Sequence, residues 1–382
     1  MSKNIEVKAY CFDLDRARQV CASLDARLAR DHQQRDTYFA VLQDRLKLRE
    51  SDKFGSCIIH YRRVDDPSLR ESSYTKVDLP NNAAALRDLL SSAIGVRIIV
   101  EKHRETYVLD PALINLDTVA ELGSFIEIEV DVEQGDAQKA LAYAHRLKSA
   151  FQISETDIVP WSYSELLAVY QNAKKWRDRL AKFPNRGRLF LIDGPSGSGK
   201  STIATRLRQN NSLGLCLARR HCTRPRRANE EDEYIFVSNE EFTALAWAGQ
   251  FLEHRNFEFG MSYGLSWQEA IQPMVQGKDV LAVVNWGNAK HIKRIFPDAN
   301  LILATASQDT LRRRLIARGT HNSEQLEERL TNAERFSHDD QVYDLIVSNE
   351  DGMLDTVVTK IADFISGPMA RQRRHAQGRA AT

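Results

Sequence analysis

The stretch LFLIDGPSGSGKSTIATRL, residues 189–207, decides the fold of the second half of the chain. Its centre, residues 194–201, matches the pattern GxxxxGK[ST] between an apolar run and a helix-forming segment, as that pattern requires. In such a loop, backbone N–H groups surround a β-phosphate, the lysine reaches the β- and γ-phosphate oxygens and the serine ligates Mg²⁺. The stretch therefore predicts a site for ATP and Mg²⁺, made of Gly194, Pro195, Ser196, Gly197, Ser198, Gly199, Lys200, Ser201 and Thr202.

The composition of the chain is that of an ordinary folded protein. Its 382 residues are enough for two or three domains, and no apolar run approaches the ~18 residues of a membrane helix. The net charge of +1 favours neither nucleic acid nor a membrane surface as a partner. Five scattered cysteines without CxxC spacing fit a reducing compartment, and the charged N-terminus is unlike a signal peptide. We therefore expect a cytoplasmic protein that binds neither membrane nor nucleic acid.

The order of apolar segments indicates two domains joined by a helix. Short β-branched or alternating runs, interrupted by two amphipathic segments, dominate the first ~165 residues. Residues 163–182 have helical spacing and end before Pro184 and Gly187. Strand and helix patterns then alternate, which predicts a parallel sheet. The expected organisation is a strand-rich domain over 1–168, a helical linker over 169–187, an α/β domain over 188–366 and a basic disordered tail over 367–382.

Arginines crowd a segment that begins shortly after the phosphate loop. They stand at positions 220, 224, 226 and 227, too many in one place to be buried together. A solvated basic face explains any one of them. Beside a phosphate loop, however, these four arginines together favour an anionic acceptor, because arginine binds phosphate through two parallel hydrogen bonds.

Residues 188–366 resemble the guanylate kinase superfamily. The resemblance rests on GPSGSGK, TRPRR, EFLE, the YG pair and an RG…RL pattern. It implies an acceptor site made of Arg224, Arg227, Tyr234, Glu253 and Tyr263, and a lid that contributes Arg318 and Arg329 to catalysis beside Lys200.

Two positions depart from the guanylate kinase pattern. Arg220 replaces a serine that helps those enzymes recognise guanine, and Asn285 replaces an acid at the end of a later strand. The arginine adds positive charge where the edge of guanine would lie. The asparagine does not accept hydrogen bonds from guanine N–H groups as a carboxylate does. Both changes favour an acceptor with more phosphate and no guanine, so Arg220 and Asn285 join the expected acceptor residues.

A sister family, the ribose 1,5-bisphosphate phosphokinases, is similar at GPSGSGK, GMSYG, DVLAVVN and RLTNAERF. This resemblance implies in-line transfer from ATP to ribose 1,5-bisphosphate, which gives 5-phosphoribosyl 1-diphosphate. A guanylate kinase that converts GMP to GDP is the alternative, because TRPRR and EFLE are typical of that family. Glu253 and Asp193 are the candidates for a general base.

Several strands of the first domain alternate charged with aliphatic residues. Glu6 and Lys8 share one face of a strand, and so do Lys102 and Arg104. RLKLRE and FIEIEV repeat the pattern, with basic pairs in the middle strands and acidic pairs at both ends of the domain. An open sheet with a solvated charged face explains any single strand. A closed barrel with a charged interior would gather all of them around a divalent cation and a polyphosphate.

Residues 1–168 resemble the CYTH family of triphosphate tunnel enzymes and class IV adenylate cyclases. The segments that carry the resemblance are IEVK, RDTYF, RLKLRE, HYRR, VEKHRETY, INLD, LGSFIEIEV and SYSELL. It implies an antiparallel β-barrel that holds Mg²⁺ or Mn²⁺ at Glu6, Glu127 and Glu129. The phosphate-binding residues that it implies are Lys8, Lys47, Arg49, Arg63, Lys76, Lys102 and Arg104.

The CYTH pattern ExExK appears here with Asn4 in place of its first acid, and Asn115 replaces a frequent histidine. The domain is then either an active metal-dependent phosphohydrolase or cyclase, or a polyphosphate-binding or regulatory module. The whole chain is expected to join this α+β barrel to an α/β P-loop kinase and to act on a small phosphorylated substrate. Its sequence leaves the oligomeric state open, a homodimer included.

Overall fold

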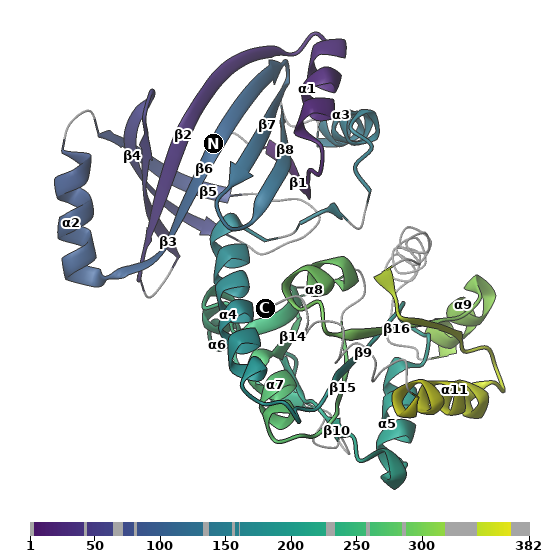
Figure 1. Cartoon of the computed structure of the whole chain (residues 1–382). Coiled ribbons are helices and arrows are strands. Elements are labelled where there is room, and N and C mark those ends of the chain that lie inside the picture. The colour runs from purple at the N-terminus through teal and green to yellow at the C-terminus, as the bar shows by residue number, and fades with distance from the viewer. Residues whose placement is uncertain are drawn as a thin grey trace. The chain divides into compact units, whose positions relative to one another are not determined.

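The described part of the chain forms two compact units (Figure 1). Unit 1 consists of Met1–Tyr170 and Asn256–Gly260, and unit 2 of Gln171–Arg255 and Met261–Thr382. No helix in the residues described is both long and apolar enough to cross a membrane. The structure is a computed structural model that describes residues 4–41, 44–63, 72–79, 82–132, 137–154, 157–159, 161–226, 234–256, 260–284, 288–317 and 342–367.

Unit 1 is built on an eight-stranded antiparallel sheet in the order β1-β8-β7-β6-β2-β3-β4-β5. The ladder described runs from β1 to β5, and the outer edge of β1 takes one further antiparallel bridge, from Ala9 to Ile158. Its strands are β1 (Asn4–Tyr10), β2 (Arg27–Phe39), β3 (Arg45–Ser51), β4 (Gly55–Arg63), β5 (Ser72–Leu79), β6 (Val96–Leu109), β7 (Ala112–Val119) and β8 (Gly123–Asp131). Its helices are α1 (Leu14–Ser23), α2 (Ala83–Ile94), α3 (Ala137–Ala150) and the start of α4 (Tyr163–Ala181).

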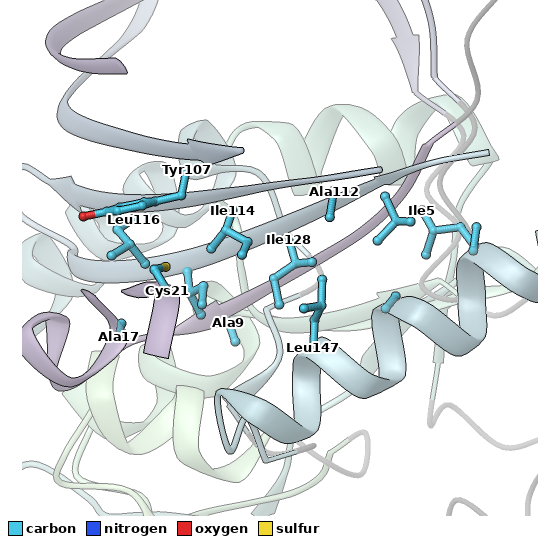
Figure 2. Packing of buried hydrophobic residues seen from close by; sticks show 14 residues of the cluster. Ile5, Ala9, Ala17, Cys21, Tyr107, Ala112, Ile114, Leu116, Ile128 and Leu147 are labelled. Atoms are coloured by element: carbon cyan, nitrogen blue, oxygen red, sulfur yellow. The ribbon is translucent and has the colours of Figure 1, made fainter. Parts of the chain in front are cut away.

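The sheet of unit 1 separates aliphatic from charged side chains. Because successive side chains of a strand point to opposite faces, Ile114 of β7 and Ile128 of β8 lie on the same face, where both are fully buried. Helices α1 and α3 cover that face with side chains such as Cys21 and Leu147 (Figure 2). Residues of opposite parity, such as Glu127, gather on the other face. The charged face therefore results from burial of the aliphatic one.

Unit 2 contains a five-stranded parallel sheet in the order β10-β15-β9-β16-β17 and a four-stranded sheet in the order β12-β11-β14-β13. The first sheet shares a buried apolar cluster with helices α5 and α11. The strands are β9 (Leu189–Asp193), β10 (Cys216–Leu217), β11 (Arg220–Cys222), β12 (Tyr234–Phe236), β13 (Phe251–Asn256), β14 (Ser262–Ser266), β15 (Val280–Val283), β16 (Asn300–Thr305) and β17 (Leu345–Ser348). The helices are α5 (Lys200–Gln209), α6 (Asn239–Trp247), α7 (Trp267–Val275), α8 (Ala289–Ile295), α9 (Gln308–Ala317) and α11 (Leu354–Ser366), with a 3-10 turn at Asn211–Leu213.

The predicted fold class is confirmed in both units: an antiparallel sheet comes first and a parallel sheet with helices follows. The sequence pattern does not predict the separate sheet β12-β11-β14-β13, because β11 and β12 have only three residues each. It also misses α2, although Leu86, Leu89, Leu90, Ala93 and Ile94 follow helical spacing in a helix that has no buried residue. The strands β11 and β12 are thus too short to show a periodicity, whereas α2 has one that the sequence analysis did not use.

Candidate functional site

The phosphate loop leaves the buried strand β9 and ends where α5 begins. Gly194, Gly197 and Gly199 have φ angles of +143°, +90° and +89°, a region that glycine enters without steric cost. A Cβ atom on Gly194 would lie 2.0 Å from the carbonyl oxygen of Ala304 in the neighbouring strand β16. The glycines are therefore required by backbone conformation and by the close approach of that strand.

Lys200 lies along the inside of this loop. Its Nζ donates to the carbonyl oxygen of Gly194 at 2.6 Å and to that of Pro195 at 2.9 Å. Ser201 and Thr202 are exposed on the first turn of α5, beside the lysine. The nine residues predicted for ATP thus belong to one loop and one helix turn, with the lysine held by backbone oxygens.

Asn349 supports the loop from the end of β17, and the motif alone does not reveal it. The residue is 4% exposed, and its Nδ2 donates to the carbonyl oxygen of Ser198 at 2.8 Å. The same Nδ2 would lie 2.4 Å from a Cβ atom on Gly199. Asn349 therefore fixes the loop just before Lys200.

A buried carboxylate stands at the root of the loop. Asp193 accepts a hydrogen bond from the Gly194 N–H at 2.7 Å and another from the Tyr343 hydroxyl at 2.8 Å. Burial raises the pKa of Asp193 to about 7, and the charge of Glu253 adds to the rise, while Tyr343 and Lys200 oppose it.

The acceptor side centres on a buried ion pair between the inner strand β11 and the edge strand β13 of the four-stranded sheet. Arg220 of β11 donates through NH2 to Oε1 of Glu253 in β13 at 3.1 Å. Asn288 donates through Nδ2 to Oε2 of the same carboxylate at 2.9 Å. Arg220 is 9% exposed and Glu253 1%, so the pair is shielded from water. The Nε of Arg220 is buried without a partner among the residues described.

Aromatic rings hold the second acceptor arginine. The Arg224 guanidinium lies 4.9 Å from the ring centre of Tyr234 and 5.4 Å from that of Phe236. Arg220 lies 5.7 Å from the ring centre of Tyr263, and the rings of Tyr234 and Tyr263 are 6.1 Å apart. The structure therefore brings together Arg220, Arg224, Tyr234, Glu253 and Tyr263, which lie apart in the sequence.

Other expected residues of unit 2 have a different outcome. Arg227, Asn285, Arg318 and Arg329 lie outside the described residues, so their roles stay predictions. Asn288, in contrast, was not predicted, although it contacts the central carboxylate. The sequence gives only a weak indication of this role, because an asparagine before a short helix is common and usually serves as its N-cap.

The charged face of unit 1 contains a continuous network around Glu127. One oxygen of Glu127 pairs with Lys8 Nζ at 3.0 Å and the other with Arg104 NH2 at 2.5 Å. Lys8 also reaches Glu6 Oε1 at 3.2 Å, and Arg104 makes two hydrogen bonds to Asp117. Asp117 belongs to the quoted INLD segment, but the pattern gave it no role.

Tyr163, the first residue of α4, covers this network. Its hydroxyl donates to Asp117 Oδ2 at 2.7 Å, and its ring centre lies 4.8 Å from Lys8 Nζ and 5.0 Å from Lys102 Nζ. Burial lowers the pKa of Lys102 to about 7, and the charge of Arg104 acts in the same direction. Lys102 therefore changes its charge near neutral pH.

A second cation cluster occupies the charged face at β2 and β3. Asp36 pairs with Lys47 Nζ at 2.9 Å and with Arg49 Nε at 2.8 Å. Burial would raise the pKa of Asp36, but Arg49 and Lys47 hold it well below its usual range. Lys76 stands apart from these buried groups, half-exposed and paired with Asp78 at 2.8 Å. The side chain of Arg63 lies outside the described part.

The three expected metal ligands share one face of β1 and β8, where Glu6 is the register partner of Glu129. Burial raises the pKa of Glu129 to about 7, and the charge of Glu127 raises it further. Among the residues described, no three acidic, histidine or cysteine side chains gather as a cation site. In the structure, Glu6 and Glu127 both pair with the ammonium group of Lys8, which takes the place that a metal ion would need. The trio therefore does not fit a divalent ion unless Lys8 moves.

Because Asn349 lies so close to Gly199, adding a methyl group at position 199 should lower the affinity for ATP, whereas adding one at an uncrowded glycine should not. Gly199→Ala should weaken ATP binding at least tenfold, because the new Cβ displaces Asn349 and with it the loop. Gly352→Ala is the matched control, since Gly352 has a similar φ of +83° but no atom within 4 Å of a new Cβ. Calorimetric titration with ATP checks both. Equal ATP affinities in the two variants would contradict this account of the loop.

The lowered pKa of Lys102 predicts that phosphate binding in unit 1 depends on pH. Lys102 is charged below about pH 7 and neutral above it, so tripolyphosphate affinity should fall as pH rises. Relative to Lys102→Arg, which stays charged, the loss between pH 6 and 8 should be about tenfold. Titrations of both proteins at several pH values give this ratio. A ratio that does not change with pH would exclude Lys102 as the titrating group.

Comparisons with known proteins identify both halves of the chain. The family models "Guanylate kinase" and "CYTH domain" match residues 186–367 and 2–163. The guanylate kinase of Hahella chejuensis is 35% identical over 170 residues, which are 44% of this chain and 80% of that protein. That of Chlorobaculum tepidum is 36% identical over 192 residues, or 48% of this chain and 96% of that protein. The crystal structure of guanylate kinase from Anaplasma phagocytophilum, 25% identical, covers 47% of this chain and 85% of its own with a TM-score of 0.37. The chain therefore belongs to the guanylate kinase family through residues 186–367, and it joins to this part a CYTH domain over residues 2–163.

Proposed function

We propose that unit 2 transfers the γ-phosphoryl group of ATP to ribose 1,5-bisphosphate and forms 5-phosphoribosyl 1-diphosphate. The observation that carries this proposal is the occupied carboxylate of Glu253. Both of its oxygens accept hydrogen bonds from the chain itself, one from Arg220 and one from Asn288. Beside this carboxylate, the Nε of Arg220 is a buried donor with no partner in the described part of the chain, which suits an acceptor atom of a ligand.

Guanine is a poor match for this arrangement. Its N1–H and N2–H groups are donors, and they require acceptors such as the two oxygens of a carboxylate. Arg220 and Asn288 each already bond to one oxygen of Glu253, so guanine would have to use the remaining lone pairs of a carboxylate that is only 1% exposed. The base would also meet the cationic side chain of Arg220. These two penalties disfavour GMP as the acceptor.

A second phosphate group is a better match. Arg220 has a buried Nε without a partner among the residues described, and a phosphate oxygen is the natural acceptor for it. Arg224, which lies near the rings of Tyr234 and Phe236, adds a second guanidinium just after the end of β11. An acceptor that carries phosphate at both ends uses both arginines, whereas a nucleoside monophosphate carries one phosphate.

The chemistry requires positioning more than proton transfer. The nucleophile is a phosphate oxygen of the acceptor, which is already ionised at neutral pH, so no general base is needed. A bond forms from this oxygen to the γ-phosphorus, and the bond from that phosphorus to the β,γ-bridging oxygen breaks, so ADP leaves. Lys200 neutralises the developing charge, and the hydroxyl of Ser201 is the residue that would hold Mg²⁺, which supplies further charge neutralisation when bound.

Guanylate kinase activity is the second candidate, and the relatives favour it. Proteins named guanylate kinase are 35–36% identical to this chain over most of their own length. Such a protein would convert GMP to GDP, with the CYTH domain in a regulatory role. The two candidates differ only in the acceptor, so they are separable by experiment.

For unit 1 we propose a binding site for phosphate chains on the charged face. Five cations on this face support it, because ion pairs with carboxylates hold each of them in place for an anionic ligand. They are the buried Lys8, Lys47 and Lys102 and the partly buried Arg49 and Arg104. A module that binds polyphosphate needs nothing further. A phosphohydrolase or cyclase would also need a metal, and then Lys8 would have to leave Glu6 and Glu127.

The acceptor preference is tested by phosphorylation assays with ATP and Mg²⁺ against ribose 1,5-bisphosphate, GMP and dGMP. We expect kcat/KM to be highest for ribose 1,5-bisphosphate. Arg220→Ser should lower that value by about 10- to 100-fold, the usual worth of a hydrogen bond to a charged group, and its thermal unfolding should show that it still folds. A preference of the parent chain for GMP would refute the proposal in favour of guanylate kinase.

A further inference from the structure

Asp193 is a buried carboxylate at the centre of the parallel sheet of unit 2. It ends β9, the middle strand of the order β10-β15-β9-β16-β17, and its exposed fraction is 0%. The four residues before it in the strand are apolar and fully buried. A buried charge lowers stability unless hydrogen bonds or opposite charges compensate for it. Packing of the strand therefore gives no reason for a carboxylate here, and the reason lies in its hydrogen bonds.

The two oxygens of Asp193 bind different parts of unit 2. Oδ1 accepts from the N–H of Gly194, the next residue, at 2.7 Å, and Oδ2 accepts from the hydroxyl of Tyr343, just before β17, at 2.8 Å. The bond from Tyr343 fixes the direction of the carboxylate, so that Oδ1 faces Gly194. Because both oxygens are engaged and the side chain is not exposed, Asp193 is not placed to act as a general base.

Gly194 is held at both of its backbone polar groups. Its N–H donates to Asp193, and its carbonyl oxygen accepts from Lys200 Nζ at 2.6 Å. Its φ of +143° lies in a region that glycine enters freely, and glycine has more backbone freedom than any other residue. The bond to Asp193 removes part of that freedom, so it helps to set the direction in which the Gly194 carbonyl group points.

Lys200 depends on that carbonyl group for its position. Its Nζ donates to the carbonyl oxygens of Gly194 and Pro195, at 2.6 Å and 2.9 Å. A lysine side chain is a flexible stem with many rotamers, so its acceptors decide where the ammonium group lies. Asp193 is thus connected to Lys200 through a single glycine.

We propose that Asp193, oriented by Tyr343, is a positioning residue for phosphoryl transfer: it sets the conformation of Gly194 and thereby places Lys200 for the γ-phosphoryl group. The inference rests on ATP-dependent transfer by unit 2 and holds for either acceptor. Because Lys200 stabilises charge that develops during transfer, a misplaced lysine should slow transfer more than it weakens ATP binding. This effect is distinct from that of Gly199→Ala, which acts on the affinity for ATP.

The test measures the rate of phosphoryl transfer in single turnovers at saturating ATP and, by calorimetry, the affinity for ATP. The full chain is used with whichever of ribose 1,5-bisphosphate and GMP the parent phosphorylates faster, so the result does not depend on the acceptor proposed above. Asp193→Ala should slow transfer about 10- to 100-fold, the usual effect of a displaced catalytic group, and change the affinity for ATP less than about threefold.

Two further variants separate the hydrogen bonds from the charge. Asp193→Asn should restore most of the rate, because an amide oxygen still accepts from Gly194 and the amide N–H donates to the oxygen of Tyr343. Tyr343→Phe should slow transfer less than Asp193→Ala, and it should have no further effect in the Asp193→Ala chain, because the hydroxyl acts through the carboxylate. Tyr343→Phe keeps the ring, so it tests the inference with little change in packing.

Asp279→Ala is the matched control. Asp279 accepts a hydrogen bond from the backbone N–H of Arg188 at 2.7 Å, next to the opposite end of β9. Its loss should leave the transfer rate of the folded protein unchanged, and thermal unfolding shows that each variant folds. Equal rates in Asp193→Ala and the parent would overturn the inference. So would an equal loss in Asp193→Ala and Asp193→Asn, or a full additional loss from Tyr343→Phe in the Asp193→Ala chain.

Discussion

Arginine and lysine side chains stay buried in both units because carboxylates lie next to them, and the proposed sites depend on this constraint. A buried charge without a partner costs several kcal/mol, so Arg220 requires Glu253, and Lys8 and Arg104 require Glu127. Each carboxylate positions a cation and, by the same contact, is itself occupied. The constraint thus creates sites for anions and limits what else the carboxylates can bind.

The two unrelated folds share this arrangement, in which a carboxylate positions a cation and is at the same time engaged by it. In unit 2 the carboxylate of Glu253 already accepts hydrogen bonds from Arg220 and Asn288, which leaves fewer lone pairs for a base that needs acceptors. In unit 1 the occupied carboxylate of Glu127 disfavours a divalent ion in the arrangement described. An incoming phosphate meets cations that are already oriented, so little side-chain freedom is lost when it binds. On the functions proposed above, the fusion joins two anion sites.

The sequence predicts local features well and contacts between distant segments poorly. Spacing alone identifies the loop that ends at Lys200, because strand, glycines, lysine and helix are neighbours in the chain. Alternation likewise assigns Glu127 and Lys102 to one kind of face. Asn288, Tyr343 and Asn349 lack such a signal, since their roles arise only when remote strands and helices meet. The network of Tyr163 with Asp117 is of the same kind, since β7 and α4 lie far apart in the sequence.

The preference of unit 2 for ribose 1,5-bisphosphate over GMP is tested most directly by a crystal structure grown with equal amounts of the two ligands. The measured quantities are the distances from the bound ligand to Arg220, Arg224 and Glu253. The account predicts a sugar bisphosphate whose phosphate oxygens lie within hydrogen-bond distance of both guanidinium groups, with Asn288 still donating to Glu253. A bound GMP whose N1–H and N2–H groups donate to Glu253, with Arg220 displaced, would contradict it.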